Sequence, residues 1–211
     1  SQIQTVTPVN PYWRGTTKVV NGENQATVAV MMIEPETFKD VIQYEFTLNS
    51  PPSQEVFQKL SSSNETLILP DALAKKLEVS VGDNLTVVTL TAGSKNFTVE
   101  GIFTGAVLQF ISFGSRPMSE TMIISFKSEE AYFYGRNQAL IFFINLKSEY
   151  KHQASQIVQE IDQTYPQYGF KERSFTLQDL FANVKTQVDR TFSIFVLMLY
   201  FTILISTLGI A

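Results

Sequence analysis

Four carboxylates lie close together early in the chain, at Glu34, Glu36, Asp40 and Glu45. Carboxylate oxygens are the ligands that hard cations such as Ca²⁺ prefer, so this group is the first candidate for a metal site. Their spacing is not that of a calcium-binding loop, and acidic side chains normally face water. We therefore predict a solvated face here and no metal site.

The chain has a single histidine, His152, the residue type best suited to act as a general base near neutral pH. It stands near the start of an expected amphipathic helix and off its apolar stripe, which predicts a solvated surface residue. The sequence contains no His-x-x-x-His, no Gly-x-Ser-x-Gly and no glycine-rich phosphate loop. We therefore expect no catalytic residue, no cofactor, no ATP hydrolysis by this chain, and a protein that is not an enzyme.

Composition narrows the classes of partner. Of the 211 residues, 44% are hydrophobic and 17% are charged, which is too apolar for a disordered chain. The net charge of −4 and the absence of a Lys/Arg cluster argue against a nucleic-acid-binding surface. The chain has no cysteine, so disulfides and thiolate metal sites are excluded.

The elements that must position any site begin with a strand, a helix and a second strand. The β-branched run Ala26–Ile33 predicts the first strand, and it is entered through a turn-like Asn-Gly segment. Pro35 suits the first turn of a helix that we expect to extend to about Ile42. Alternation over Tyr44–Leu48 then predicts the second strand.

The same pattern recurs late in the chain. Ala139–Leu146 predicts a strand, residues 150–165 predict a helix, and residues 169–175 predict a further strand. The helix carries an apolar stripe with spacings of three and four, which favours packing on a sheet. Two such units commonly combine into an α+β fold of the ferredoxin-like kind.

A different pattern separates the two units. A short helix is expected over Asp71–Leu77, followed by alternating strands over Asn84–Thr91 and Lys95–Phe103 and by a strand at 121–126. Glu129 and Glu130 are expected to start a helix, where acids complement the helix dipole. We predict a small β-rich insertion that contains one helix.

An uncharged segment, Phe192–Ala211, closes the chain. About 20 apolar residues in a helix span the ~30 Å hydrocarbon core of a bilayer, so we predict a membrane-spanning helix at 192–211. The preceding residues 175–190 predict an amphipathic helix, and no Gly or Pro separates it from the span. We expect one continuous stalk helix, whose candidate coupling face is formed by Leu177, Leu180, Phe181, Val184 and Val188.

Residues 105–120 are richer in large apolar side chains than a loop normally is. One interpretation is that these side chains are buried in a core. The alternative is an exposed patch that contacts a partner or a lipid-like cargo. The candidate contact residues are Leu108, Phe110, Ile111 and Phe113.

Short motifs then connect the chain to a known family. The order is Leu73–Leu77 (LAKKL), Val81–Asp83 (VGD), Phe97–Ile102 (FTVEGI), an amphipathic helix at 153–162, and Leu208–Ile210 (LGI). In this order the motifs resemble the extracytoplasmic core domain of MacB/FtsX-like ABC transporter permeases, which include the lipoprotein-release permeases LolC and LolE. The match covers nearly all of the chain. One departure is Glu78, which stands where many relatives place Gly.

The resemblance implies an extracytoplasmic domain of a permease subunit that transmits ATP-driven motion across the membrane to an exported substrate or outer partner. It also implies a cytoplasmic ABC ATPase as partner, a homodimer or heterodimer of permease subunits, and a cell-membrane location with residues 1–190 on the extracytoplasmic side. A permease would have one span before Ser1 and two more after Ala211. The alternative is the ectodomain of a membrane-anchored binding or sensor protein without an ATPase.

The predicted organisation follows from these elements. Residues 1–48 and 136–176 are expected to form a porter-like α+β subdomain, and residues 49–135 the β-rich insertion. Residues 177–211 are expected to form the stalk helix, which continues into the membrane-spanning segment at 192–211.

Overall fold

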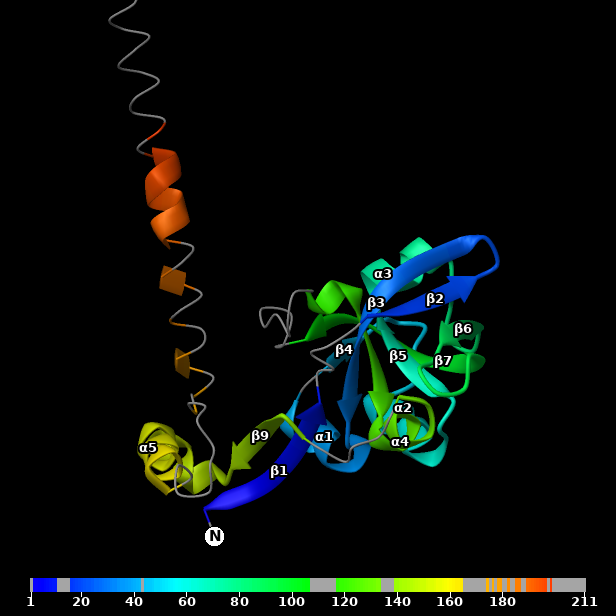
Figure 1. Ribbon diagram of the computed structural model, residues 1–211. Coiled ribbons are helices and arrows are strands. Elements are labelled where there is room, and N and C mark those ends of the chain that lie inside the picture. The colour runs from blue at the N-terminus through cyan, green and yellow to red at the C-terminus, as the bar shows by residue number, and fades with distance from the viewer. Residues whose placement is uncertain are drawn as a thin grey trace, which may run out of the picture. The chain divides into compact units, whose positions relative to one another are not determined.

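The computed structural model describes residues 2–10, 16–42, 44–106, 117–133 and 139–164, together with positions 174, 176, 178, 179, 182, 185, 186, 189–196 and 198 (Figure 1). The chain divides into two compact units, Ser1–Lys147 and Ser148–Ala211. Each unit is described by itself.

The first unit is built on one mixed sheet, which has nine strands within the described part of the chain. Its strands run in the order β2-β6-β7-β5-β8-β3-β1-β9, and β4 pairs with β7 outside this path. The strands are β1 (Ile3–Asn10), β2 (Thr17–Asn21), β3 (Asn24–Ile33), β4 (Tyr44–Phe46), β5 (Thr66–Pro70), β6 (Asn84–Val88), β7 (Ser94–Ala106), β8 (Thr121–Ser125) and β9 (Ile141–Leu146).

Six of these strands close on themselves. The path from β2 through β6, β7, β5 and β8 to β3 returns to its start because β2 also pairs antiparallel with β3. The β2–β3 pairing runs from Thr17 opposite Val28 to Asn21 opposite Asn24 around a tight turn. Closure removes the two free edges that an open sheet of these strands would present to other chains.

The closed strands enclose one hydrophobic core. Their inward residues include Val28, Leu67 and Phe97, all completely buried. Helix α3 (Asp71–Leu77) adds Leu73, Ala74 and Leu77 to the same cluster. Phe133, which follows helix α4 (Phe126–Tyr132), is also part of it.

A second core lies on the opposite face of the central strands. Helix α1 (Pro35–Val41) contributes Phe38, and helix α2 (Ser53–Ser62) contributes Val56, Phe57 and Leu60. Along β3, Val30 and Met32 belong to the first core, whereas Met31 and Ile33 belong to the second. This period-two alternation buries both faces of β3, which explains why Ala26–Ile33 is almost uniformly apolar.

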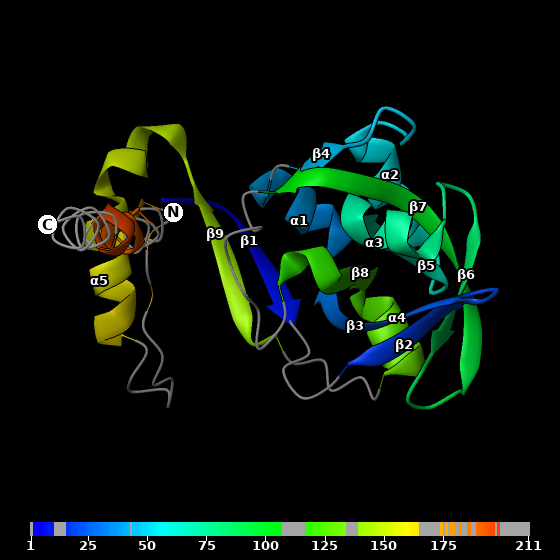
Figure 2. The same cartoon turned by 90° about the horizontal axis from the view of Figure 1, so that it is seen from above.

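Three strands, β1, β2 and β5, and the helix α2 were not expected from the sequence. Pro8 lies inside β1, where a proline normally argues against a strand. The structure accommodates it because β1 pairs with β3 only at Val9 and Asn10, so at Pro8 the strand has β9 on one side alone. β1 and β9 form a long two-stranded ribbon there (Figure 2).

Helix α2 was not expected because the residues at both of its ends are typical of loops. Its flanks, Pro51-Pro52 and Ser61–Ser63, read as loop signals in the sequence. In the structure Pro52 precedes the first turn, and the hydroxyls of Ser61 and Ser62 donate to the carbonyls of Gln58 and Lys59. The serines therefore end a helix rather than form a loop.

The second unit contains a 3-10 segment, η3 (Ser148–Gln153), and helix α5 (Ala154–Thr164). Ile157, on the predicted apolar stripe of α5, is buried. Gln178, Asp179, Ala182, Lys185, Thr186, residues 189–196 and Met198 are helical. The predicted strand at 169–175 falls almost entirely outside the described residues.

The prediction of a mixed α+β fold is confirmed. The expected strands at 26–33, 44–48, 84–91, 95–103, 121–126 and 139–146 correspond to β3, β4, β6, β7, β8 and β9, with some ends shifted. Strands from both sides of residue 48 share one sheet, because β6 pairs with β2 and β8 pairs with β3. The predicted subdomain boundaries and the ferredoxin-like description stay predictions.

Candidate functional site

Two of the motifs that resemble the permease family, LAKKL and VGD, lie in α3 and in the turn that follows it. The Glu78 amide donates to the carbonyl of Lys75, and the Val79 amide donates to the carbonyl of Ala74. This pair of bonds is the Schellman arrangement, which requires a left-handed residue after the helix. That residue is Glu78, with φ 54° and ψ 47°, and no other non-glycine residue in the described ranges has a positive φ.

The left-handed backbone explains the sequence departure. A glycine adopts this conformation without steric cost, so the family pattern and the geometry agree on what the position needs. Here the chain adopts it with a glutamate. A residue of β2 also holds the turn, because the side-chain amide of Asn21 donates to the carbonyl oxygens of Leu77 and Glu78 at 2.9 and 3.2 Å.

Gly82 and Asp83 form the next turn. Gly82 has φ +91°, and its amide donates to the carbonyl of Val99 on β7. The Asp83 carboxylate accepts a 2.7 Å bond from the Ser80 amide. These contacts are structural, since they reverse the chain into β6 and fix β6 on β7.

Gly101 lies at an irregularity between β5 and β7. Leu67 is opposite Val99 whereas the next residue, Ile68, is opposite Gly101, so Glu100 is the extra residue of a bulge. A Cβ atom at Gly101 would lie 2.8 Å from both Phe46 Cε1 and Val56 Cγ1. The glycine therefore allows β4 and α2 to approach β7 closely.

An aromatic cluster surrounds Tyr44 beside this bulge. The Tyr44 ring is 5.1 Å from Phe103 in an edge arrangement and 5.7 Å from Phe38. Phe46 and Phe57 lie at 6.1 Å. The Tyr44 hydroxyl is buried without a hydrogen-bond partner among the described residues, and this burial raises the pKa of Tyr44.

The strand that carries Tyr44 pairs with the last described residues before the predicted contact segment. β4 pairs with the end of β7, where Tyr44 is opposite Ala106. The four predicted contact residues, Leu108, Phe110, Ile111 and Phe113, follow immediately in the sequence but lie outside the described residues. Their role as a partner or cargo contact stays a prediction.

Of the early carboxylates, Glu36, Asp40 and Glu45 are exposed and Glu34 is half-buried. The Glu36 side chain bonds to Lys39 at 3.0 Å and accepts from the Ser61 hydroxyl, and these bonds hold the pKa of Glu36 below its usual value. Within the described ranges, no group of three or more potential ligands is placed to hold a metal ion. His152 is exposed, and its ring contacts the neighbouring Gln153 amide at 3.1 Å.

Glu129 lies in the first turn of α4, close to the predicted helix start, but its side chain is buried. It is only 4% exposed, and its carboxylate accepts a 2.9 Å bond from the side-chain amide of Asn10 at the end of β1. A buried carboxylate is stable only when it is hydrogen-bonded or paired. No local sequence pattern could indicate this pair, because Asn10 and Glu129 are 119 positions apart.

The described residues cover only part of the predicted stalk helix. The Thr176 hydroxyl and amide both donate to the Asp179 carboxylate, and the Asp179 amide donates back to the Thr176 hydroxyl. This reciprocal pattern is a capping box, which marks a helix start. The bonds from Thr176 lower the pKa of Asp179. The predicted coupling residues Leu177, Leu180, Phe181, Val184 and Val188 lie outside the described residues.

The beginning of the predicted membrane span is helical and exposed. Phe192, Ile194, Phe195, Val196 and Met198 are between 40% and 70% exposed. At ~100° per residue these positions spread around the helix axis rather than forming one stripe. Among the described residues, no helix is both long and apolar enough to cross a bilayer, so the predicted span is not supported by the structure.

No protein-family model and no curated protein sequence matches the chain. Solved structures that are similar in fold include the following two. The extracellular domain of the noncanonic ABC-type transporter YknZ from Gram-positive bacteria is 14% identical, with a TM-score of 0.54 over 82% of this chain and 80% of that domain. The periplasmic region of MacB from Actinobacillus actinomycetemcomitans is 12% identical, with a TM-score of 0.57 over 88% of this chain and 77% of that region.

Proposed function

We propose that this chain is the extracytoplasmic domain of an ABC transporter permease subunit. The observation that carries the proposal is the likeness in fold to the outer domains of YknZ and MacB, which extends over 80% and 77% of their lengths. The order of the motifs around α3, the Gly82 turn and the Gly101 bulge supports the same assignment. In this proposal residues 1–190 lie outside the cell membrane.

We further propose that the domain works mechanically. A helix that begins at the Thr176 capping box and continues into the membrane at 192–211 would carry motion from the lipid interior to the outer unit. The exposed apolar side chains on several sides of the helix between Phe192 and Met198 favour insertion into lipid. ATP hydrolysis is assigned to a separate cytoplasmic ATPase, and the permease subunits are expected to pair as a homodimer or heterodimer.

The outer unit is organised for this role by its two cores. The closed strands and α1–α2 make a body with both faces of the central sheet buried, which favours movement as one rigid unit. In the proposal the porter-like subdomain is formed by residues 1–48 and 136–176, and the insertion by residues 49–135. The segment with Leu108, Phe110, Ile111 and Phe113 is proposed to contact cargo or an outer partner.

Location is tested by labelling single cysteines in the full-length protein. The chain has no cysteine of its own, so every label reports one introduced site. Leu48→Cys is suited to this because Leu48 is completely exposed in a turn between β4 and α2. Two hydrogen bonds hold that turn on β7. The Thr47 backbone amide donates to the carbonyl of Ile102, and the Ile102 backbone amide donates to the Ser50 hydroxyl.

We expect a membrane-impermeant maleimide to label Leu48→Cys in intact spheroplasts. Val56→Cys serves as the control for chemical accessibility, because Val56 is completely buried and should stay unlabelled. Labelling of Leu48→Cys only after the cell membrane is permeabilised would contradict the proposed location.

Coupling is tested in the reconstituted transporter with its ATPase. Leu180→Asp with Phe181→Asp places charges on the predicted coupling face and should uncouple ATP hydrolysis from transport. Gln178→Asp with Ala182→Asp is the matched control, because both residues are exposed on the helix and the change in charge is the same. Equal transport by the two double variants would contradict the mechanical role, and failure of the full-length protein to co-purify with any ATPase would favour an anchored sensor.

A further inference from the structure

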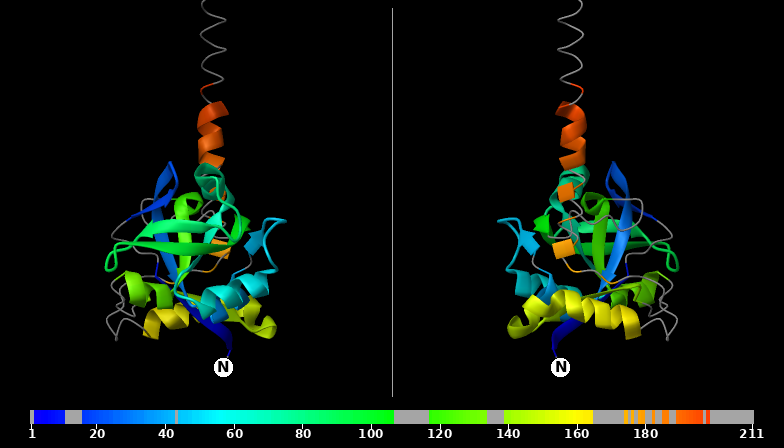
Figure 3. Two further views of the ribbon diagram at one scale, coloured as in Figure 1. Left: turned by 90° about the vertical axis from the view of Figure 1, so that its right-hand side faces the viewer. Right: turned by 90° about the vertical axis from the view of Figure 1, so that its left-hand side faces the viewer.

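An open cavity of about 610 Å³ lies in the first unit, between the β2–β3 hairpin, helix α3 and the 3-10 turn η2 (Met118–Glu120). The hairpin projects from the body of the unit beside α3 (Figures 1 and 3). This volume is in the range of ligand-binding clefts, which is roughly 300–1,000 Å³. The cavity is lined by Lys18, Gln25, Ala26, Thr27, Ala72, Leu73, Lys76, Ser119 and Glu120.

The floor of the cavity belongs to the rigid core. Ala26 and Leu73 are 6% and 3% exposed and are members of the cluster inside the closed strands. The floor is therefore pre-formed, because buried core side chains are closely packed. The apolar lining residues are two alanines and one leucine, Ala26, Ala72 and Leu73. The floor therefore fits an aliphatic side chain rather than a lipid tail.

The rim carries two cations without counter-ions. Within the described part of the chain, neither Lys18 nor Lys76 has an ion pair or a hydrogen bond, whereas the neighbouring Lys75 bonds to Asp71 at 2.6 Å. Lys76 has Ala72 four residues before it, where Lys75 has an aspartate. On the hairpin Lys18 is opposite Thr27, so no acid faces it across the strands.

The charge balance of the lining selects an anion. Two lysines and the single acid Glu120 give a formal sum of +1 on a chain whose net charge is −4. A local positive potential of this kind attracts an anionic ligand to an otherwise acidic protein. Gln25, Thr27 and Ser119 add amide and hydroxyl groups, which can hydrogen-bond to a peptide backbone.

We propose that this cavity binds an acidic peptide segment, with a ligand carboxylate between Lys18 and Lys76 and an adjacent aliphatic group on the Ala26–Leu73 floor. A peptide fits better than an anionic lipid, because the cavity offers polar donors along an open groove and little apolar depth. The site is separate from the predicted contact residues at 108–113 and does not depend on the permease assignment.

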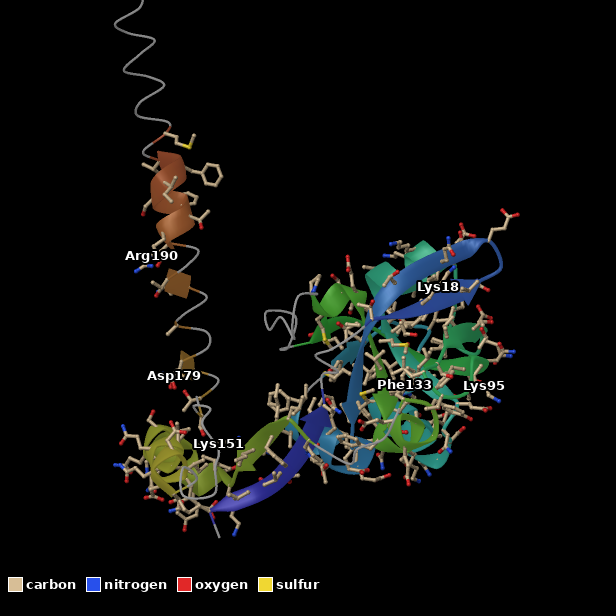
Figure 4. All side chains as sticks on the ribbon, in the orientation of Figure 1. Lys18, Lys95, Phe133, Lys151, Asp179 and Arg190 are labelled. Atoms are coloured by element: carbon tan, nitrogen blue, oxygen red, sulfur yellow. The ribbon has the colours of Figure 1, made fainter. Side chains whose placement is uncertain are left out.

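The proposal is tested with the full chain in detergent and a fluorescein-labelled hexapeptide of alternating Asp and Ala, by fluorescence anisotropy. Lys18→Gln with Lys76→Gln should weaken binding roughly tenfold, about threefold for each lysine. Lys95→Gln with Lys151→Gln is the control with the same change in charge, and neither residue lines the cavity (Figure 4). This control should bind the peptide as the unmodified chain does.

Several outcomes would overturn the proposal. One is equal affinity of the two double variants, provided that circular dichroism shows both to be folded. Another is equal binding of a hexapeptide in which Asn replaces Asp, because the carboxylates would then be irrelevant. Lysine-dependent binding to phosphatidylglycerol vesicles without binding of the acidic peptide would replace the peptide by a lipid headgroup.

Discussion

Replacing Glu78 by glycine should make the protein more stable. Glu78 has φ 54° and ψ 47° at the end of α3, a conformation that costs an L-residue about 1–2 kcal/mol. Glycine avoids this cost but loses about 0.5–1 kcal/mol more backbone entropy on folding. The hydrogen bonds of the turn use backbone atoms of residue 78, so the substitution keeps them. The expected net gain is about 0.5–1 kcal/mol.

The measurement is urea unfolding of the full chain, followed by far-UV circular dichroism. Glu78→Ala is the control, because it removes the exposed side chain but keeps the Cβ atom that makes the left-handed backbone costly. We expect Glu78→Ala to lie within about 0.5 kcal/mol of the unmodified protein and Glu78→Gly to exceed both. If the glycine variant were no more stable than the alanine variant, the argument from backbone strain at this turn would be refuted.

Three further predictions follow from the same geometry. Gly101→Ala should destabilise the protein by about 1–3 kcal/mol in the same unfolding assay, because its Cβ would lie 2.8 Å from Phe46 and Val56; an unchanged midpoint would contradict this. Tyr44→Phe should be neutral or stabilising by up to about 1 kcal/mol, because it removes a buried hydroxyl without a partner in the described ranges; a loss of more than 1 kcal/mol would contradict that. The Asp179 carboxylate, whose pKa is lowered in the folded helix, should stabilise the helix start above a pH of about 4 and lose this effect as the pH falls through the lowered pKa, which the Thr176 amide signal in NMR would report. An amide signal that does not move over that range would argue against the capping box.

Local sequence patterns predicted the elements whose apolar pattern or first residue indicates their type. The apolar run of β3 and the Pro35 helix start are of this kind. The alternation in β6 and β7 likewise predicted two strands, which pair antiparallel from Asn84 opposite Thr98 to Val88 opposite Ser94. Each of these signals depends on residues that are near one another in the sequence.

The features that the sequence did not reveal depend on distant segments. Closure of the strands requires β2 to pair with both β3 and β6, and residues 17–21 alone are too short to indicate two neighbours. Pro8 and the serines at the end of α2 are residues typical of loops. Pro8 is nevertheless in a strand because β1 pairs with β9 there, and α2 forms because Phe57 packs in the second core. The buried Asn10–Glu129 bond and the cavity at Lys18 and Lys76 likewise arise only in the folded chain.

The candidate sites likewise differ in how far the sequence could predict them. The left-handed turn at Glu78 was not predicted, because the glutamate stands where the resembled family often has glycine and does not itself indicate a positive φ. The predicted contact residues at 108–113 and the coupling face on the stalk rested on apolar composition, and they fall outside the described residues. Composition identifies such segments but does not determine what covers them, because burial in a core and contact with a partner require the same residue types.

The proposed mechanism depends on a stalk helix that is continuous from the outer unit into the membrane. Double electron–electron resonance on the full-length transporter, with spin labels on Gln178→Cys and Met198→Cys, measures this continuity directly. A continuous helix rises ~1.5 Å per residue, so the account predicts a narrow distance distribution near 30 Å with and without ATP. A broad distribution, or a mean well below 30 Å, would show a break near Arg190 and contradict the transmission of motion by this helix.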